Sequence, residues 1–305
     1  MDLSIVVVSW NTRELLRNCL TSIDRTIDGI QYEVLVVDNA STDGSAEMVA
    51  RDYPDTRLIR NRDNRGFARA NNQAMRVAQG RHLLLLNSDA ALLPGAASTL
   101  VSFMETHPGA GLVGAQLLNA DGSFQASYAD FPSFVGEVLL LTRLASLVYP
   151  RTYPSYPSEQ SQAAAPVDWV FGACLLARRS AVDAVGFLDE DYFMYSEETD
   201  WCYRMHRGGW EVCYVPEAKV LHWSGQSAGA APERKRSQLY RSKCLFMRKH
   251  WGRFTAHAFS LTVRIASALN LLAWTALGSA DPDRARRERA RQRARSYQQL
   301  LLGKL

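Results

Sequence analysis

Three apolar runs in the first half of the chain lack the polar alternation expected of a strand with one solvent-facing side. They are Leu3 to Trp10, Tyr32 to Asp38 and His82 to Asn87, and β-branched residues or leucines dominate each of them. A strand that is apolar on successive residues is buried on both faces, which is typical of a parallel sheet covered by helices. The runs therefore predict an α/β fold with a mostly parallel central sheet.

The segments between these runs have helical spacing. We predict helices at Arg13 to Ile27, Ser45 to Asp52 and Gly66 to Ala78, and a short strand at Thr56 to Arg60. Ligands of such sheets bind at the carboxyl ends of the strands, so polar residues that directly follow a strand are candidate site residues. These are Trp10, Asn11, Asp38, Asn39, Asn87, Ser88 and Asp89.

Composition narrows the class of protein. With 305 residues, 47% of them hydrophobic, the chain is long enough for one large domain or two small ones with a real core. The net charge is only +4 and much of the basic excess lies beyond Asp281, so nucleic acid is not the expected partner. The five cysteines form no C-x-x-C pair and no secretory signal is evident, which predicts a reduced, cytosolic protein with buried thiols.

The second half is less regular. We predict an amphipathic helix at Val135 to Tyr149, a proline-rich loop at Pro150 to Pro166 that could act as a lid, and a buried strand at Trp169 to Ala177. A short helix at Ser180 to Val185 and two short strands within Glu211 to Gly225 complete the pattern.

Three carboxylates, Glu197, Glu198 and Asp200, gather at the predicted start of a helix. If the helix begins at Ser196, Asp200 can pair with Arg204 four residues later, whereas Glu198 points elsewhere. A carboxylate left free among aromatic side chains can have a raised pKa and act as a base. The alternative interpretation is an N-terminal turn whose acids offset the helix dipole.

Two further clusters suit a nucleotide. Asp38 can accept the imino N–H of a pyrimidine or a ribose hydroxyl, or it can cap the following helix, although Asp43 suits the cap better. Asn64, Arg65 and Gly66 place a glycine and a cation where a loop enters a helix, which suits a diphosphate near backbone N–H groups.

Asp89 follows a buried strand and could hold Mg²⁺ or Mn²⁺, which prefer oxygen ligands. His222, after the final predicted strand, could complete the site, because imidazole suits Mn²⁺ better than Mg²⁺. A satisfied buried histidine is the alternative for His222.

Seven blocks in this order resemble the family 2 glycosyltransferases with the GT-A fold, and among them the bacterial rhamnosyltransferases of cell-surface polysaccharide synthesis. The blocks are SIVVVSWN, VLVVDNASTDGS, NRGFARANN, LLLLNSDA, FGACLLARR, FMYSEETDWCYR and VLHWSG. The resemblance covers roughly Leu3 to Arg248 and implies a glycosyltransferase domain over residues 1–250.

The resemblance also implies roles for individual residues. Glu198 would be the catalytic base, with Glu197 and Asp200 as alternates, and a divalent metal, Mg²⁺ or Mn²⁺, would be held by Asp89 and His222. Ala91 stands where the family's D-x-D element has its second acid. The implied nucleotide-sugar-binding residues are Ser9, Trp10, Asn11, Asp38, Asn64, Arg65, Gly66, Arg69, Asn71, Ser88 and Trp223.

The implied reaction is a single displacement with inversion, in which a base deprotonates the acceptor hydroxyl and a nucleoside diphosphate leaves. The expected donor is dTDP-L-rhamnose and the expected acceptor a polyprenyl-diphosphate-linked glycan. A degenerate subunit that binds nucleotide or glycan is the alternative, because the second acid is missing. A nucleotidyltransferase is disfavoured, because the first strand leads into Ser9-Trp10-Asn11-Thr12 rather than a Gly- and Lys/Arg-rich loop.

Residues 251–305 are predicted to form a helical extension. Phe259 to Gly278 is apolar with Arg264 as its only charge, and seven arginines follow between Arg284 and Arg295. We expect this extension to lie at a membrane interface, on the cytoplasmic face of the plasma membrane, with packing against protein or a true span as alternatives. The pattern does not fix the oligomeric state, and a homo-oligomer stays an alternative.

Overall fold

The computed structural model describes residues 1–142, 163–223, 232–280 and 283–303, which form two compact units. The first unit contains residues 1–131, 163–193 and 197–223 of this described part, and the second contains residues 132–142, 194–196 and those from 232 onward. The domain boundary predicted at residue 250 stays a prediction.

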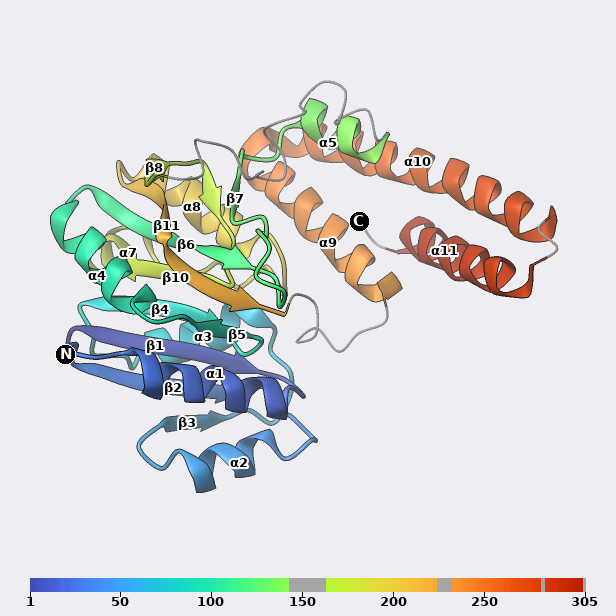
Figure 1. Cartoon of the computed structure of the whole chain (residues 1–305). Helices are drawn as coiled ribbons and strands as arrows, with labels where there is room; N and C mark the ends of the chain where they lie inside the picture. The colour runs from blue at the N-terminus through green and yellow to red at the C-terminus, as the bar shows by residue number, and fades with distance from the viewer. Residues whose placement is uncertain (143–162, 224–231, 281–282, 304–305) are drawn as a thin grey trace. The chain divides into compact units, whose positions relative to one another are not determined.

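A nine-stranded mixed sheet organises the first unit (Figure 1). Its main strands run in the order β3-β2-β1-β4-β10-β6-β11-β5, and β8 pairs with β11. Neighbours are parallel from β3 to β4 and between β6 and β11, whereas β10 and β5 are antiparallel to their neighbours. The strands are β1 (Leu3–Ser9), β2 (Tyr32–Asp38), β3 (Arg57–Arg60), β4 (His82–Asn87), β5 (Ala90–Leu92), β6 (Ala110–Leu118), β8 (Ala165–Pro166), β10 (Cys174–Arg178) and β11 (Glu211–His222).

Helices cover both faces of this sheet, and successive residues of the central strands therefore enter two different cores. Ile5 and Val7 of β1 pack in the core on one face, whereas Val6 packs in the core on the other. This arrangement is the physical reason for the absence of polar alternation in the sequence. The helices of this unit are α1 (Arg13–Thr26), α2 (Ser45–Asp52), α3 (Phe67–Met75), α4 (Ala96–Thr106), α7 (Arg179–Val185) and α8 (Glu197–Arg207).

The second half departs from the predicted pattern in three places. The strand predicted over Trp169 to Ala177 is wrong as one element, because β9 (Trp169–Val170) pairs with β7 (Tyr128–Ala129) outside the main sheet. The two strands predicted within Glu211 to Gly225 are one strand, β11, whose register shifts between Val215 and Lys219. Most of the predicted loop at Pro150 to Pro166 lies outside the described residues, but its last two residues form β8.

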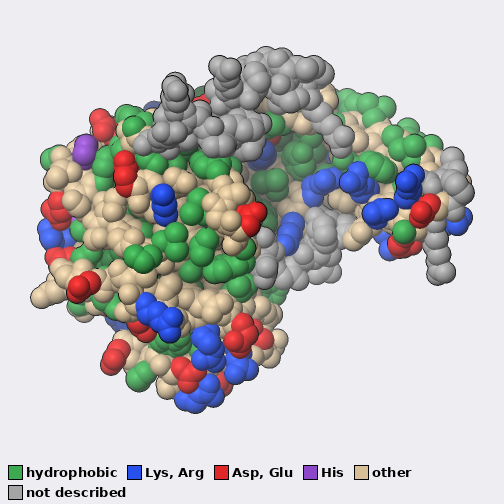
Figure 2. Space-filling view, in the orientation of Figure 1, with side chains coloured by type: hydrophobic (Ala, Val, Ile, Leu, Met, Phe, Trp, Pro, Cys, Tyr) green, Lys and Arg blue, Asp and Glu red, His purple; other side chains and the backbone are tan. Residues whose placement is uncertain are grey.

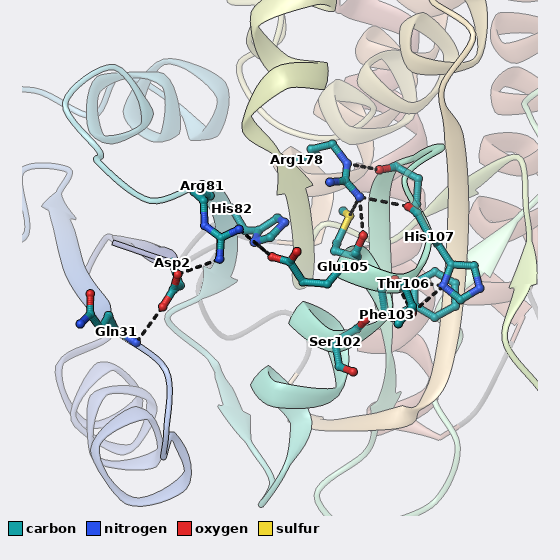
Figure 3. A network of polar contacts seen from close by, with 12 residues as sticks. Asp2, Gln31, Arg81, His82, Ser102, Phe103, Glu105, Thr106, His107 and Arg178 are labelled. Carbon is teal, nitrogen blue, oxygen red and sulfur yellow. Dashed lines mark hydrogen bonds and ion pairs between the residues drawn. The ribbon is translucent and has the colours of Figure 1, made fainter.

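A polar network fastens the end of α4 to the amino edge of the sheet (Figure 3). The Arg81 guanidinium lies 2.8 Å from an Asp2 carboxylate oxygen and 3.0 Å from a Glu105 carboxylate oxygen. Arg178 donates to the backbone carbonyls of Ala110 and His107. This edge is opposite to the carboxyl ends of β1, β2 and β4, so the network belongs to the scaffold.

The second unit is helical. Its elements are α5 (Phe134–Leu141), α9 (Pro232–Phe246), a π-helical segment at Met247–Trp251, α10 (Gly252–Ala280) and α11 (Arg284–Leu302). A small core that includes Cys244, Met247 and Phe259 joins α5, α9, the π-helical segment and α10, and Lys243 of α9 donates to both carboxylate oxygens of buried Glu137 at 2.7 Å. The predicted helix at Val135 to Tyr149 is confirmed over α5, and its last residues lie outside the described part.

One helical run, Lys235–Ser279, is long and apolar enough by length and composition to cross a membrane. Only 17% of its apolar window is buried within the structure, so it is not an enclosed core helix.

Candidate active site

Three strands end side by side at the edge where the candidate residues were predicted. In the parallel ladders Ser9 of β1 is level with Asp38 of β2, and Val8 is level with Asn87 of β4. The clusters after β1, β2 and β4 therefore lie together, as the rule for parallel sheets predicted.

A chain of buried hydroxyl groups joins the ends of β1 and β4. The Ser9 Oγ lies 3.0 Å from the Thr12 Oγ1, and the Thr12 hydroxyl donates to the Ser88 Oγ at 2.9 Å. Ser9 and Ser88 are both fully buried, at 0% and 1% exposure. Their hydroxyls therefore hold the strand ends together, which places the partly exposed Trp10 at this edge.

Asp38 is 4% exposed, and its two carboxylate oxygens differ in their surroundings. Oδ2 accepts the backbone N–H of Ser41 at 3.1 Å, whereas the buried Oδ1 has no hydrogen-bond partner among the described residues. Asp43 instead accepts the backbone N–H groups of Arg13 and Ser45, the first residues of α1 and α2. Asp43 rather than Asp38 therefore serves the starts of the two helices, as predicted, and the ligand-binding role of Asp38 stays a prediction.

Asn11 fixes the loop after β2. Its side-chain oxygen accepts the Thr42 backbone N–H at 2.7 Å, and its own N–H donates to the Ser41 Oγ at 3.0 Å. Asn11 has a φ of 55° and Ala40 a φ of 65°, both in the left-handed region that L-residues rarely adopt. Backbone strain of this kind concentrates at functional sites, which favours this edge as a binding surface.

Hydrogen bonds from two asparagine side chains hold the loop that leads into α3. Asn39 donates to the Asn64 side-chain oxygen at 2.9 Å and accepts the Arg65 N–H at 3.0 Å, while Asn64 also accepts the Gly66 N–H. A Cβ added at Gly66 would lie 2.4 Å from the Phe193 carbonyl oxygen, and the Phe67 N–H donates to that same oxygen. The glycine thus allows the chain before α8 to approach α3, and its diphosphate role stays a prediction.

A pocket of about 600 Å³ lies beside α3 and includes Arg65 and Arg69 in its lining. Both arginine side chains are about half exposed, and each lies 3.7 Å from one carboxylate, Asp63 for Arg65 and Glu190 for Arg69. Asn71 is buried and donates to the Phe67 carbonyl of its own helix. The pocket is also lined by the acids Asp63, Glu190 and Asp191, so the anion-binding role of Arg65 and Arg69 stays a prediction, whereas Asn71 is committed to the helix.

Asp89 and His222 come together although 133 positions separate them in the chain. The His222 Nε2 lies 3.4 Å from the Asp89 Oδ1, and the Trp223 N–H donates to the Asp89 carbonyl at 2.9 Å. Ala91 pairs with Leu221 inside the sheet and supplies no ligand atom. Within the described residues, no group of three or more His, Cys, Asp or Glu side chains is arranged so that it could hold a metal ion.

One carboxylate and one imidazole fit a divalent cation that takes its other ligands from diphosphate oxygens and water. Asp89 and His222 are the residues that would hold it. The second acid of the D-x-D pattern is not replaced from elsewhere in the described chain.

The acidic turn at the start of α8 separates its carboxylates as the spacing predicted. The Arg204 guanidinium donates to the Asp200 carboxylate at 2.7 Å and to the carbonyls of Val185 and Phe187. Oε2 of Glu197 and Oε2 of Glu198 are each buried without a hydrogen-bond partner among the described residues. Asp200 is therefore held in a structural ion pair, and the catalytic role of Glu198 or Glu197 stays a prediction.

Burial sets the pKa values of this pair. Loss of water raises the pKa of Glu198 to about 7 from its usual 4.5, although backbone N–H groups at the helix start oppose the shift. Burial, and then repulsion from Glu198, raises the pKa of Glu197 well above its usual value. A carboxylate with a pKa near 7 is suited to accept a proton at neutral pH.

Glu198 lies near the same edge of the sheet as Asp89. A Cβ added at Gly172 would lie 3.5 Å from the Glu198 Cβ, and the next residue, Ala173, accepts the Asn87 N–H at 3.0 Å. Asn87 precedes Asp89 by two residues. The chain before α8 also contains two residues with left-handed φ, Tyr195 at 69° and Ser196 at 64°.

Two contacts of the site were not predicted from the sequence: Asn39 holds the α3 loop, and Gln125 is the partner of His222. Asn39 stood in a recognised polar cluster, but only the fold shows which loop it holds. Gln125 lies just after β6, a strand that was not predicted, 2.6 Å from the His222 ring. The Asn-Ala-Asp-Gly turn at residues 119–122 was the available signal.

Comparison with known proteins gives consistent results. A family model described as Glycosyl transferase family 2 matches residues 4–186. The chain is 30% identical over 261 residues to an N-acetylglucosaminyl-diphospho-decaprenol L-rhamnosyltransferase of Mycobacterium tuberculosis, which covers 80% of this chain and 83% of that protein.

Two solved structures resemble the fold. A Pyrobaculum calidifontis mannosyltransferase in complex with GDP-Man and Mn²⁺ has a TM-score of 0.56 at 19% identity, over 98% of this chain and 86% of that one. GalNAc-T7 with UDP, GalNAc and Mn²⁺ has a TM-score of 0.56 at 15% identity, over 82% and 51%.

Proposed function

The chain belongs to glycosyl transferase family 2 and has the GT-A fold, and from this premise we propose that it moves L-rhamnose from dTDP-L-rhamnose to a polyprenyl-diphosphate-linked glycan with inversion. L-Rhamnose and a lipid diphosphate both occur in the name of the mycobacterial relative, which supports rhamnose as the transferred sugar and a lipid-linked diphosphate as the acceptor. Residues 1–250 would form the transferase domain and residues 251–305 an extension.

The state of Glu198 carries the proposal. Its Oε2 is buried without a protein partner among the described residues, and burial raises its pKa to about 7. In the proposed step Glu198 takes the proton of the acceptor hydroxyl, and the oxygen attacks the anomeric carbon as the bond to the diphosphate oxygen breaks. The nucleoside diphosphate leaves with the electron pair of that bond. One base suffices, because a diphosphate needs no proton to leave.

The other candidate residues at this edge of the sheet would bind the nucleotide-sugar donor. The spare Asp38 oxygen would accept an N–H of the base or a ribose hydroxyl, with Trp10 and Asn11 beside it. Asp89 and His222 would hold a divalent cation, which when bound neutralises charge on the leaving diphosphate. Arg65 and Arg69 would add positive charge from the pocket beside α3.

The second unit supports a peripheral position on the cytoplasmic side of the plasma membrane. Leu261, Ile265, Leu269 and Leu272 form one exposed apolar stripe along α10, each more than half exposed. The exposed arginines of α11 supply positive charge that anionic lipid attracts. Figure 2 shows hydrophobic and basic side chains next to one another over this part of the chain.

Release of nucleoside diphosphate tests the reaction. Purified full-length protein is incubated with dTDP-, UDP- and GDP-sugars, a membrane extract as acceptor source, and Mg²⁺, Mn²⁺ or a chelator. We expect release from dTDP-L-rhamnose that requires metal and that increases as the pH passes 7, because Glu198 must lose its proton.

The Glu198→Gln variant is expected to lose transfer by about 10²–10⁴-fold, the usual contribution of a general base. Release from no donor at any pH would favour the alternative, a subunit that binds nucleotide or glycan without turnover.

A further inference from the structure

Each ring nitrogen of His222 faces a side-chain oxygen. The Nδ1 lies 2.6 Å from the Gln125 Oε1, and the Nε2 lies 3.4 Å from the Asp89 Oδ1. Which nitrogen carries the hydrogen decides whether the imidazole can offer a lone pair toward Asp89. The hydrogen bonds of Gln125 indicate which ring nitrogen carries the hydrogen.

The orientation of the Gln125 amide follows from groups that can only accept. Its Nε2 donates to the backbone carbonyl of His222 at 3.2 Å and to the Asn119 side-chain oxygen at 2.9 Å. Asn119 is oriented in turn, because its own amide nitrogen donates to the Phe124 carbonyl at 3.2 Å. Both N–H groups of Gln125 are thus committed, and its oxygen must face the imidazole.

A compact turn holds this amide in place. The Gln125 backbone N–H donates to the Leu117 carbonyl of β6 at 2.9 Å, and the Asn119 N–H donates to the Ser123 carbonyl at 2.8 Å. Gly122, with a φ of 79°, allows the chain to reverse between them. Gln125 is therefore fixed to the end of β6, next to the end of β11 where His222 lies.

We infer that Gln125 is a positioning residue for the proposed metal site, since it accepts the Nδ1–H of His222 and so directs the Nε2 lone pair to the side where Asp89 lies. Histidines that bind metals commonly donate their other N–H to such an acceptor, which fixes both tautomer and ring orientation. The inference rests on the proposed function, because it assigns His222 to the cation of that site. Gln125 itself touches neither cation nor sugar in this role.

Mn²⁺ binding, measured from the electron paramagnetic resonance signal of free Mn²⁺ with dTDP present, tests the inference on the full chain. Gln125→Leu removes the acceptor and is expected to weaken Mn²⁺ binding by about 10–100-fold. Gln125→Glu keeps an oxygen acceptor and is expected to bind Mn²⁺ more tightly than Gln125→Leu. In a His222→Ala background Gln125→Leu should have no further effect, because its contribution passes through the imidazole.

The tautomer gives a second readout that needs no metal and no turnover. Two-bond ¹H–¹⁵N spectra of the metal-free protein should show the His222 hydrogen on Nδ1 in the wild type and its redistribution in Gln125→Leu. Unchanged Mn²⁺ affinity in a folded Gln125→Leu variant, or a hydrogen on Nε2 in the neutral wild type, would overturn the inference alone. Failure of the wild type to bind Mn²⁺ would overturn both the inference and the proposed metal site.

Discussion

At the scale of the residue, Glu198 can be explained as a base or as an acid that offsets the dipole of α8, and the two explanations predict opposite effects on stability. A stabilising acid has a lowered pKa in the folded protein, because folding favours its charged form. Burial instead raises the pKa of Glu198 to about 7. The folded state then binds more protons than the unfolded state between about pH 4.5 and 7, so stability falls as the pH rises through this window.

We therefore expect Glu198→Gln to raise the melting temperature by a few degrees at pH 8 and to leave it nearly unchanged near pH 4.5. Calorimetry at both pH values checks this. Asp200→Asn is the matched control, and it should lower the melting temperature at pH 8, because it breaks the 2.7 Å ion pair with Arg204. A lower melting temperature for Glu198→Gln at pH 8 would instead support the helix-dipole explanation.

At the scale of the element, the junction of α3 with the chain before α8 holds the acidic turn in place. Gly66 has a φ of 80° and a ψ of 176°, a conformation that is essentially restricted to glycine, and the Phe193 carbonyl occupies the space where a side chain would begin. Asn72 of α3 adds a clamp by donating to the Leu188 carbonyl at 2.8 Å. The position of Glu197 and Glu198 thus depends on an element more than 100 residues earlier.

Gly66→Ala is expected to destabilise the fold by about 1–3 kcal/mol and to reduce sugar transfer, because Phe193 must move away from the new methyl group. Urea unfolding and nucleoside diphosphate release measure the two effects. Gly95→Ala is the control, since Gly95 has a φ of 81° with no atom within 4 Å of the added Cβ. If the two variants lost equal stability and activity, the close approach to Phe193 would have no role.

At the scale of the whole molecule, the second unit has an apolar surface on α10 that is not buried in its own core. Arg264 is the only charge within residues 259–278, and it donates to the carbonyls of Leu301 and Gly303 at the end of α11. A cation is favoured at a helix C-terminus, so this arginine joins the two helices instead of interrupting the apolar stripe. The stripe on α10 is left continuous and exposed.

Sedimentation with vesicles tests the membrane contact. We expect the protein to bind vesicles that contain anionic lipid, and Leu269→Gln combined with Leu272→Gln to reduce binding by at least about tenfold, because each leucine contributes roughly 1.5–3 kcal/mol on burial. Arg289→Gln with Arg291→Gln should reduce binding to anionic vesicles and leave binding to neutral vesicles nearly unchanged. Val77→Gln, on an exposed residue of the first unit, is the control. Equal binding by all variants would contradict the proposed surface.

The β-α order, the parallel half of the sheet and the edge where polar residues gather are predictable from sequence, because those features follow from local hydrophobic periodicity and strand direction. The sequence also predicted that Asp200 pairs with Arg204, since four residues on a helix bring side chains together. These are short-range consequences of the chain.

The contacts between distant residues are visible only in the folded chain. Folding brought His222 to Asp89 and Gln125 to His222, through strands β6 and β11 whose pairing no local pattern reveals. In the structure the two strands predicted within Glu211 to Gly225 form the single strand β11, and the strand predicted at Trp169 to Ala177 forms β9 and β10. Gly66 lies directly against the Phe193 backbone. Contacts between distant segments are set by packing and burial, and the raised pKa of Glu198 is likewise a property of its surroundings.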